Sequence, residues 1–236
     1  MNFKISEDLR KKFKGFCSSP EIIMLFVYMK CRFSLSYRDL EEMAIMRGIR
    51  LDHATIARWV LKFVKLIDLK VKKYKKPVGS SWRMDETYIK VKGKWVYLYR
   101  ALDSLGNTID FLLRKYRDKA AAKALFKKTF NHNGRPDKCT IDKSGSNIAA
   151  LEDANNGLKE EDQIEIRTIK YLNNIIEQDH RFIKKRTKPM LGFKSFNSAK
   201  ITLTGIENIR MIHKGQIDGA NDSLSTFENF VLLMAA

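Results

Sequence analysis

Three consecutive strand-like segments joined by short turns are the feature that most constrains the fold. Residues 82–91 (WRMDETYIKV), 95–102 (WVYLYRAL) and 108–114 (TIDFLLR) are rich in β-branched and aromatic residues, which favour strands. Lys92-Gly93 and residues 104–107 separate them and have turn composition. Because such short connections join antiparallel neighbours, we expect an antiparallel meander.

Helices and strands alternate after this meander. Asp118 is placed to cap a helix that runs to about Phe130, and a short strand at about 138–141 ends at Asp142. The remaining expected elements are a helix near 146–154, a strand near 164–168 and a helix from Asn173 or Asn174 to about Arg186. The order of three strands, helix, strand, helix, strand, helix resembles the ribonuclease-H-like α/β fold, which has a mixed five-stranded sheet.

The N-terminal part has a helical pattern instead. An apolar run from Ile22 to Met29 follows Pro20, which suits the first turn of a helix. Ser36 precedes Asp39 by three positions, a weak capping box that would open a second helix ending before Gly48.

A third helix would begin at Asp52 or His53 and complete a helix-turn-helix. In that motif the second helix enters the major groove of DNA, and its early outward-facing residues, here His53, Thr55 and Arg58, reach base edges. The alternative is a helical hairpin that packs and reads no DNA.

These differences in residue pattern along the chain predict four segments. They are a helix-turn-helix domain over 1–68, a basic linker over 69–80, a catalytic domain over 81–213 and a tail over 214–236. Within the linker, the side chains expected to contact DNA phosphates are Lys72, Lys73, Lys75 and Lys76. The apolar spacing of a helix from about Ser195 to His213 predicts that it covers the sheet.

The formal net charge of +18 favours a polyanionic partner, nucleic acid first and an acidic membrane surface second. The longest apolar run, residues 22–29, is too short to span a bilayer, and the N-terminus is too polar for a signal peptide. Cys17, Cys31 and Cys139 match no zinc or disulfide pattern, so we expect inert thiols in a reducing, intracellular compartment.

Three acids are candidates for phosphodiester chemistry on DNA, which two hard metal ions can promote by binding the attacking and leaving oxygens. Asp85 lies inside the first strand, Asp142 follows the fourth strand, and Glu177 lies on the helix near 173–186. Lys184, two turns after Glu177 on the same helical face, would hold a DNA phosphate near the metals.

Each acid also has a structural alternative. Asp142 could cap the next helix, Glu177 could complete a capping box with Asn174, and Asp85 could pair with a Lys or Arg across the sheet. Of the four histidines, His180 alone is placed one turn from Glu177 and could lie near the site, whereas the others are expected on the surface or in packing.

Several strings in order resemble the IS6-type insertion-sequence transposases. They are LDHATIARWV (51–60), DETYIKVKGKWVYLYRALD (85–103), the interval of 34 residues between Asp142 and Glu177, and YLNNIIEQDHRFIKKR (171–186). The resemblance covers roughly residues 20 to 213. It implies that Asp85, Asp142 and Glu177 are the catalytic metal ligands and that Lys184 is the basic residue seven positions further.

The same resemblance implies an integrase-like catalytic core that uses Mg²⁺, with Mn²⁺ able to substitute. It implies cutting at the terminal inverted repeats of double-stranded DNA, joining of the 3′ ends to target DNA, and a homo-oligomer on paired ends in the bacterial nucleoid. Two alternatives remain: a domesticated or inactive DNA-binding descendant of a transposase, and a host nuclease of the same fold, which would not need the helix at 51–60.

Overall fold

A computed structural model describes residues 3–142 and 145–236. The chain forms two compact units: a helical unit, Met1–Lys76 with Phe193–Ala236, and a sheet unit, Pro77–Gly192. The predicted boundaries were at 68, 80 and 213, whereas the two units meet at 76/77 and at 192/193. The helix that was expected to cover the sheet belongs to the helical unit.

The sheet unit contains five strands: β1 (Ser81–Val91), β2 (Lys94–Asp103), β3 (Thr108–Arg114), β4 (Lys138–Thr140) and β5 (Glu165–Arg167). Their order across the sheet is β3-β2-β1-β4-β5. The first three strands pair antiparallel, and β4 and β5 continue the sheet in parallel from β1. This mixed sheet is the ribonuclease-H-like topology that the sequence predicted.

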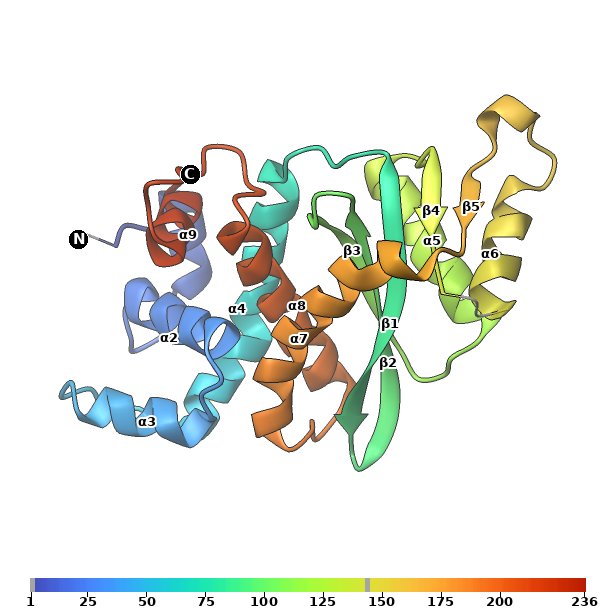
Figure 1. Cartoon of the computed structure of the whole chain (residues 1–236). Coiled ribbons are helices and arrows are strands. Elements are labelled where there is room, and N and C mark those ends of the chain that lie inside the picture. Colours follow the sequence, from blue (N-terminus) through green and yellow to red (C-terminus); the bar gives the residue numbers. More distant parts are fainter. Residues whose placement is uncertain (1–2, 143–144) are drawn as a thin grey trace. The chain divides into compact units, whose positions relative to one another are not determined.

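Helices pack on both faces of this sheet (Figure 1). One face carries α5 (Lys119–Asn133), which also packs against α6 (Gly145–Asn155). The opposite face carries α7 (Asn174–Thr187), which contacts β1 and β2. The main core of the unit lies between the sheet and α5 and α6, and its largest members are Trp82, Met84, Tyr99, Leu125, Phe126 and Leu151. Because side chains alternate along a strand, Met84 and Glu86 face this core whereas Asp85 and Thr87 face the opposite way.

The helical unit consists of α1 (Glu7–Arg10), α2 (Pro20–Arg32), α3 (Tyr37–Ile45), α4 (His53–Tyr74), α8 (Phe196–His213) and α9 (Thr226–Ala235). Short 3-10 turns complete the chain at Lys11–Phe13, Glu160–Asp162, Lys170–Asn173 and Lys188–Met190. The buried stripe of α4, which includes Ile56, Phe63 and Ile67, explains why this helix is the centre of the unit. It packs against α2, α3 and α8.

The helix starts were predicted well because their caps are local. Ser36 and Asp39 form both bonds of a capping box, and Asp52 caps α4 through the amides of Ala54 and Thr55. Gly48, at φ 71°, ends the turn after α3 as expected.

Two expectations were wrong. The segment 69–80 is not a linker throughout, because α4 continues to Tyr74. The helix at 196–213 packs against α4 and α2, so its apolar stripe reports burial in the helical unit.

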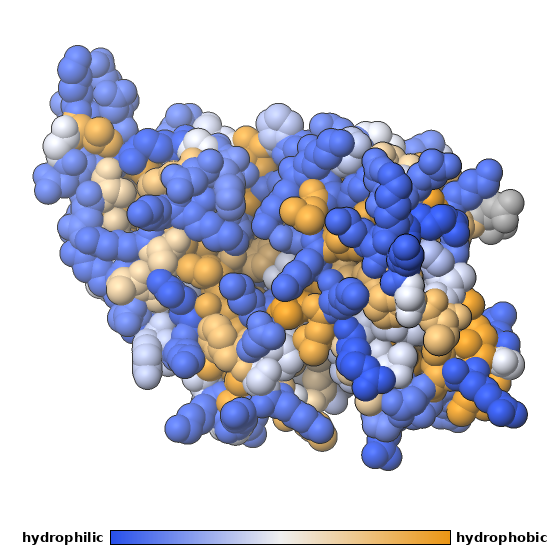
Figure 2. Space-filling view, turned by 180° about the vertical axis from the view of Figure 1, so that it is seen from behind, coloured by the Kyte–Doolittle hydropathy of each residue, from blue (hydrophilic) through white to orange (hydrophobic). Residues whose placement is uncertain are grey.

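The surface is mostly hydrophilic, in keeping with the 31% of charged residues in the sequence. On the face drawn in Figure 2, hydrophilic residues cover most of the surface, with hydrophobic patches between them. None of the helices described is both long and apolar enough to cross a lipid bilayer.

Candidate active site

Two neighbouring strands bring acidic side chains together in the sheet unit. Asp85 lies within β1, and Asp142 follows β4, which pairs in parallel with the start of β1. Asp85, Glu86 and Asp142 each offer a carboxylate oxygen, and these oxygens lie within 4.8 Å of one another. Lys143 and Ser144, which follow Asp142, lie outside the described residues.

Glu177 occupies the first turn of α7 and is exposed. It is not a member of the acidic group found among the described residues, although α7 packs against β1. The capping alternative for Glu177 finds no support, because Asn173 is the N-cap of α7 and makes no side-chain cap bond. Lys184 is exposed near the end of the same helix.

His180 contacts Asp85 directly. Its Nε2 lies 3.2 Å from Asp85 Oδ2, and its Nδ1 lies 3.3 Å from Nη1 of Arg100, the residue opposite Asp85 on β2. Arg100 in turn donates from Nη2 to Asp179 Oδ2 at 2.5 Å. The cross-strand cation considered as a partner of Asp85 is therefore bound to Asp179, and the residue that contacts Asp85 is His180.

A second group of polar side chains supports Asp142. Arg117 forms ion pairs with Glu86 and with Asp142, the latter at 3.2 Å. Asn147 donates to Asp142 Oδ1 at 3.0 Å and lies 3.4 Å from Glu86 Oε2. Burial raises the pKa of Glu86, and the positive charge of Arg117 opposes that rise.

This donor set fits a divalent cation. Carboxylate oxygens are the hard ligands that Mg²⁺ and Mn²⁺ bind. Asn147 Oδ1 is also buried without a hydrogen-bond partner among the described residues, on the same amide whose Nδ2 lies 3.0 Å from Asp142 Oδ1. Arg117 already pairs with two of these acids, and a divalent cation would offset more of the negative charge gathered there.

The sequence predicted Asp85 and Asp142 as candidates and His180 as a neighbour of the site, but it did not indicate Glu86, Arg117 or Asn147. Glu86 was hidden because it neighbours Asp85 in sequence while facing the other side of the sheet. Arg117 and Asn147 gave no sequence signal, since their role depends on where the chain folds back.

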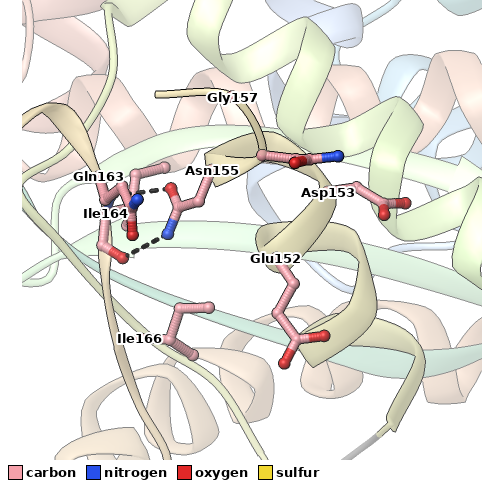
Figure 3. A pocket seen from close by; sticks show the side chains of 8 residues that line it. Glu152, Asp153, Asn155, Gly157, Gln163, Ile164 and Ile166 are labelled. Carbon is pink, nitrogen blue, oxygen red and sulfur yellow. Dashed lines mark hydrogen bonds between the residues drawn. The ribbon is translucent and has the colours of Figure 1, made fainter. Parts of the chain in front are cut away.

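A separate open hollow of about 620 Å³ lies where the end of α6 meets β5. Asn155 binds the backbone N–H and C=O of Ile164, both at 2.9 Å, and fixes its wall (Figure 3). Glu152 and Asp153 line it, but none of the site acids does.

The residues predicted to bind DNA lie on or just after α4. His53 Nδ1 contacts Glu41 of α3 at 3.1 Å, and Arg58 donates to Thr55 Oγ1 at 2.8 Å. Arg58 is exposed, whereas His53 and Thr55 are half-buried.

The four lysines are placed differently from one another. Lys72 pairs with Asp68 at 2.7 Å and Lys73 lies over the ring of Tyr74, so both belong to the helix. Lys75 forms a β-bridge with Ile217, and Lys76 donates to the carbonyl of Gly215 at 2.9 Å. All four belong to the helical unit.

Helical geometry adds two cations that the sequence interpretation did not include. Lys62 and Lys65 are exposed and fall on the same side of α4 as Arg58 and Lys72, at spacings of 4, 7 and 14 residues from Arg58. We call Arg58, Lys62, Lys65 and Lys72 the basic face of α4.

Comparison with known proteins agrees with the geometry. A family described as a DDE domain matches residues 79–216. The transposase for insertion sequence-like element IS431mec of Staphylococcus aureus is 41% identical over 196 residues, which cover 83% of this chain and 86% of that protein. The transposase for insertion sequence element IS257 in transposon Tn4003, from the same species, matches at the same identity and coverage.

Solved structures give more distant matches. The HTLV-2 integrase catalytic core domain in complex with magnesium is 14% identical, with a TM-score of 0.46 over 65% of this chain and 98% of that one. The catalytic core domain of BIV integrase is 12% identical, with a TM-score of 0.42 over 65% of this chain and 95% of that one. The family match and the identity to the Staphylococcus proteins are decisive: the chain belongs to the DDE transposases of the IS6 insertion-sequence type.

Proposed function

We propose that this transposase binds the terminal inverted repeats of its insertion sequence, cuts the 3′ ends and joins them to double-stranded target DNA. The observation that carries the proposal is the meeting of carboxylate oxygens of Asp85 and Glu86, inside β1, and Asp142, just after β4, within 4.8 Å of one another. The related Staphylococcus transposases, which share most of their length with this chain, support the choice of reaction.

We assign Asp85, Asp142 and Glu177 as the metal ligands. Mg²⁺, with Mn²⁺ as a substitute, would activate the attacking oxygen and stabilise charge on the phosphate and the leaving oxygen. Glu177 is exposed on a helix that packs against β1, so its side chain is available to complete a ligand shell that the other two acids begin.

The protein's own side chains then have separate tasks. His180 holds Asp85, while Arg117 and Asn147 hold Asp142. Lys184, on the face of α7 that carries Glu177, would bind a phosphate of the cleaved strand as a cation.

We assign DNA reading to the helical unit. α4 follows α3 through a turn that contains Gly48, and its N-terminal residues include His53, Thr55 and Arg58. The basic face of α4, with Lys73, Lys75 and Lys76, would contact phosphates and hold the protein in register. Joining two ends in one event calls for a homo-oligomer that pairs them, and we place the protein on the bacterial nucleoid.

The test uses a labelled duplex that carries the inverted repeat flanking the gene, with Mg²⁺ present. We expect the parent protein to nick the 3′ end, and Asp142→Asn to bind equally well but to lose at least about 10³-fold in rate, as expected when a metal ligand of the reaction is removed. Asp153→Asn is the matched control, because Asp153 is an exposed acid of α6 that pairs with Lys119 of α5 at 2.7 Å and is not a member of the acidic group.

The outcomes separate the alternatives. Binding without nicking by the parent would favour an inactive descendant of a transposase. Equal nicking by Asp142→Asn would overturn the assigned site, and nicking that ignores the repeat sequence would favour a nuclease.

A further inference from the structure

A buried chain of polar contacts lies behind Asp85. Arg100, Asp179 and His180 are 0%, 7% and 4% exposed, so the Arg100–Asp179 ion pair and the imidazole are withdrawn from water. Burying a charge is costly unless it is hydrogen-bonded, so a role beyond packing is worth seeking for this group.

The chain of contacts fixes the proton on His180. Arg100 is always protonated and has only donors, so at 3.3 Å its Nη1 donates to His180 Nδ1. The proton of the neutral ring therefore sits on Nε2, and Nε2 donates to Asp85 Oδ2 at 3.2 Å. Asp179 holds the Arg100 guanidinium in the required orientation.

We infer that His180 is a positioning residue for Asp85, with its tautomer set by Arg100 and Asp179. The donated hydrogen bond commits Oδ2 to the protein and fixes the plane of the carboxylate, which leaves Oδ1 for the divalent ion. This inference rests on the proposed metal site and adds the residues that orient one of its ligands.

The helix that carries Glu177 also carries this device. Glu177 and His180 are one turn apart on α7, so one helix supplies both a proposed ligand and the orienting donor of another. A partner one step behind a metal ligand commonly changes metal affinity or activity by 10- to 100-fold when it is removed.

Two amide substitutions separate positioning from packing. In His180→Gln the side-chain NH₂ reaches the place of Nε2 and can still donate to Asp85. In His180→Asn the amide reaches only the place of Nδ1, so it can accept from Arg100 but cannot reach Asp85. If His180 has only a structural role, His180→Asn should bind the metal ion at least as well as His180→Gln. If His180 positions Asp85, His180→Gln should bind it better.

The measurement is binding of Mn²⁺ alone to the full chain, followed by the electron paramagnetic resonance signal of free Mn²⁺. Mn²⁺ binding at the site is defined as the binding that is lost in the Asp85→Asn variant. We expect His180→Asn to weaken it by about 10-fold and His180→Gln by less than about threefold. The Mn²⁺ concentration for half-maximal nicking should rise in the same order, with repeat-DNA binding unchanged.

His132→Asn is the matched control. His132 is a histidine of the same unit that contacts an acid through a ring nitrogen, Asp110 at 3.3 Å, away from the site acids. It should leave Mn²⁺ binding unchanged, and thermal unfolding of every variant should report an intact fold.

The results distinguish the two levels of the argument. If Asp85→Asn binds Mn²⁺ like the parent, the proposed metal site fails and the positioning role fails with it. If Asp85→Asn loses Mn²⁺ while His180→Asn binds as well as His180→Gln, the metal site stands and the positioning role alone is overturned.

Discussion

Arg100 shows how much depends on one buried side chain. Its guanidinium is fully buried and contacts Asp179 and His180, which lie in the same turn of α7. Removing one partner of a buried ion pair leaves the other charge without compensation, which costs more than the pair itself contributes.

We therefore expect Arg100→Met to destabilise the protein by about 3 kcal/mol, because Asp179 would be left buried and charged. Urea unfolding followed by tryptophan fluorescence measures this, since Trp82 lies in the core of the same unit. Adding Asp179→Asn should recover a large part of the loss. A single variant as stable as the parent would show that the pair is not compensating a buried charge.

Candidate acids were easier to select from the sequence than the side chains that contact them. Asp85 and Asp142 were detectable because an acid inside a strand and an acid at a strand end are unusual positions. His180 was the one histidine that the sequence placed near the site, and the structure adds that its partner is Asp85. Glu86, Arg117 and Asn147 became related only when β1, the segment before α5 and the start of α6 converged. Such relations depend on long-range folding, which a local pattern does not encode.

At the scale of elements, α8 has a glycine where another helix approaches closely. A Cβ built on Gly205 would lie 2.4 Å from Cys31 Sγ of α2 and 3.0 Å from Val64 Cγ2 of α4. The three helices can pack this closely only because position 205 has no side chain.

Gly205→Ala should therefore destabilise the helical unit by about 1–2 kcal/mol, since overpacking outweighs the roughly 1 kcal/mol that alanine gains in helix propensity. Removing the sulfur with Cys31→Ala in the same chain should return most of the loss. The measurement is the urea midpoint. Thr204→Ala, at the half-buried neighbouring position of the same helix, is the control and should change the stability by no more than about 0.5 kcal/mol. Gly205→Ala at or above parental stability would contradict this packing.

The capping box of α3 predicts a pH effect. Bonds from the backbone and side chain of Ser36 lower the pKa of Asp39 below its usual value near 3.8. A lowered pKa in the folded state means that the stabilisation is present above the unfolded pKa and is lost as pH falls through the folded one.

Below about pH 4, the parent should thus lose stability more steeply than Asp39→Asn, which keeps an acceptor but does not titrate. Thermal melts at steps between pH 5 and pH 2.5 measure the difference. Parallel curves for the two proteins would show that Asp39 does not contribute to the acid response.

Elements were predicted where their signals are local and missed where they are not. Caps at Ser36, Asp52 and Asp118 fixed helix starts, and short turns fixed the meander. The lysines at 70–73 resembled a linker, but lysine is a good helix former and Val71 continues the buried stripe of α4. The stripe of α8 showed that one face is buried without showing against which unit, and so its placement was wrong.

At the scale of the whole molecule, the net positive charge could be read from the composition, whereas its distribution over the surface depends on the fold. The excess of +18 is consistent with a protein that acts on DNA, and part of it forms the basic face of α4 in the helical unit. Lys184, the cation proposed to bind a phosphate near the acids, is exposed on the sheet unit.

Binding to the repeat duplex in the absence of metal should weaken steeply with salt, because each phosphate contact releases condensed counterions. The slope of log K against log salt should be about −0.9 for each phosphate contacted, and Lys65→Gln should make it shallower by roughly one. The slope is measured by fluorescence anisotropy of a labelled duplex at NaCl concentrations from about 50 to about 300 mM.

The matched variant is Lys159→Gln, which neutralises an exposed lysine of the sheet unit that lies 3.8 Å from Glu161. Net charge changes by the same amount in both variants, so a change in slope for Lys65→Gln alone identifies a local contact on α4. Equal changes in both would mean that the total charge, and not the basic face of α4, governs binding. A flat salt response in the parent would remove phosphate contact as the source of affinity, and with it the reason to assign DNA docking to this helix.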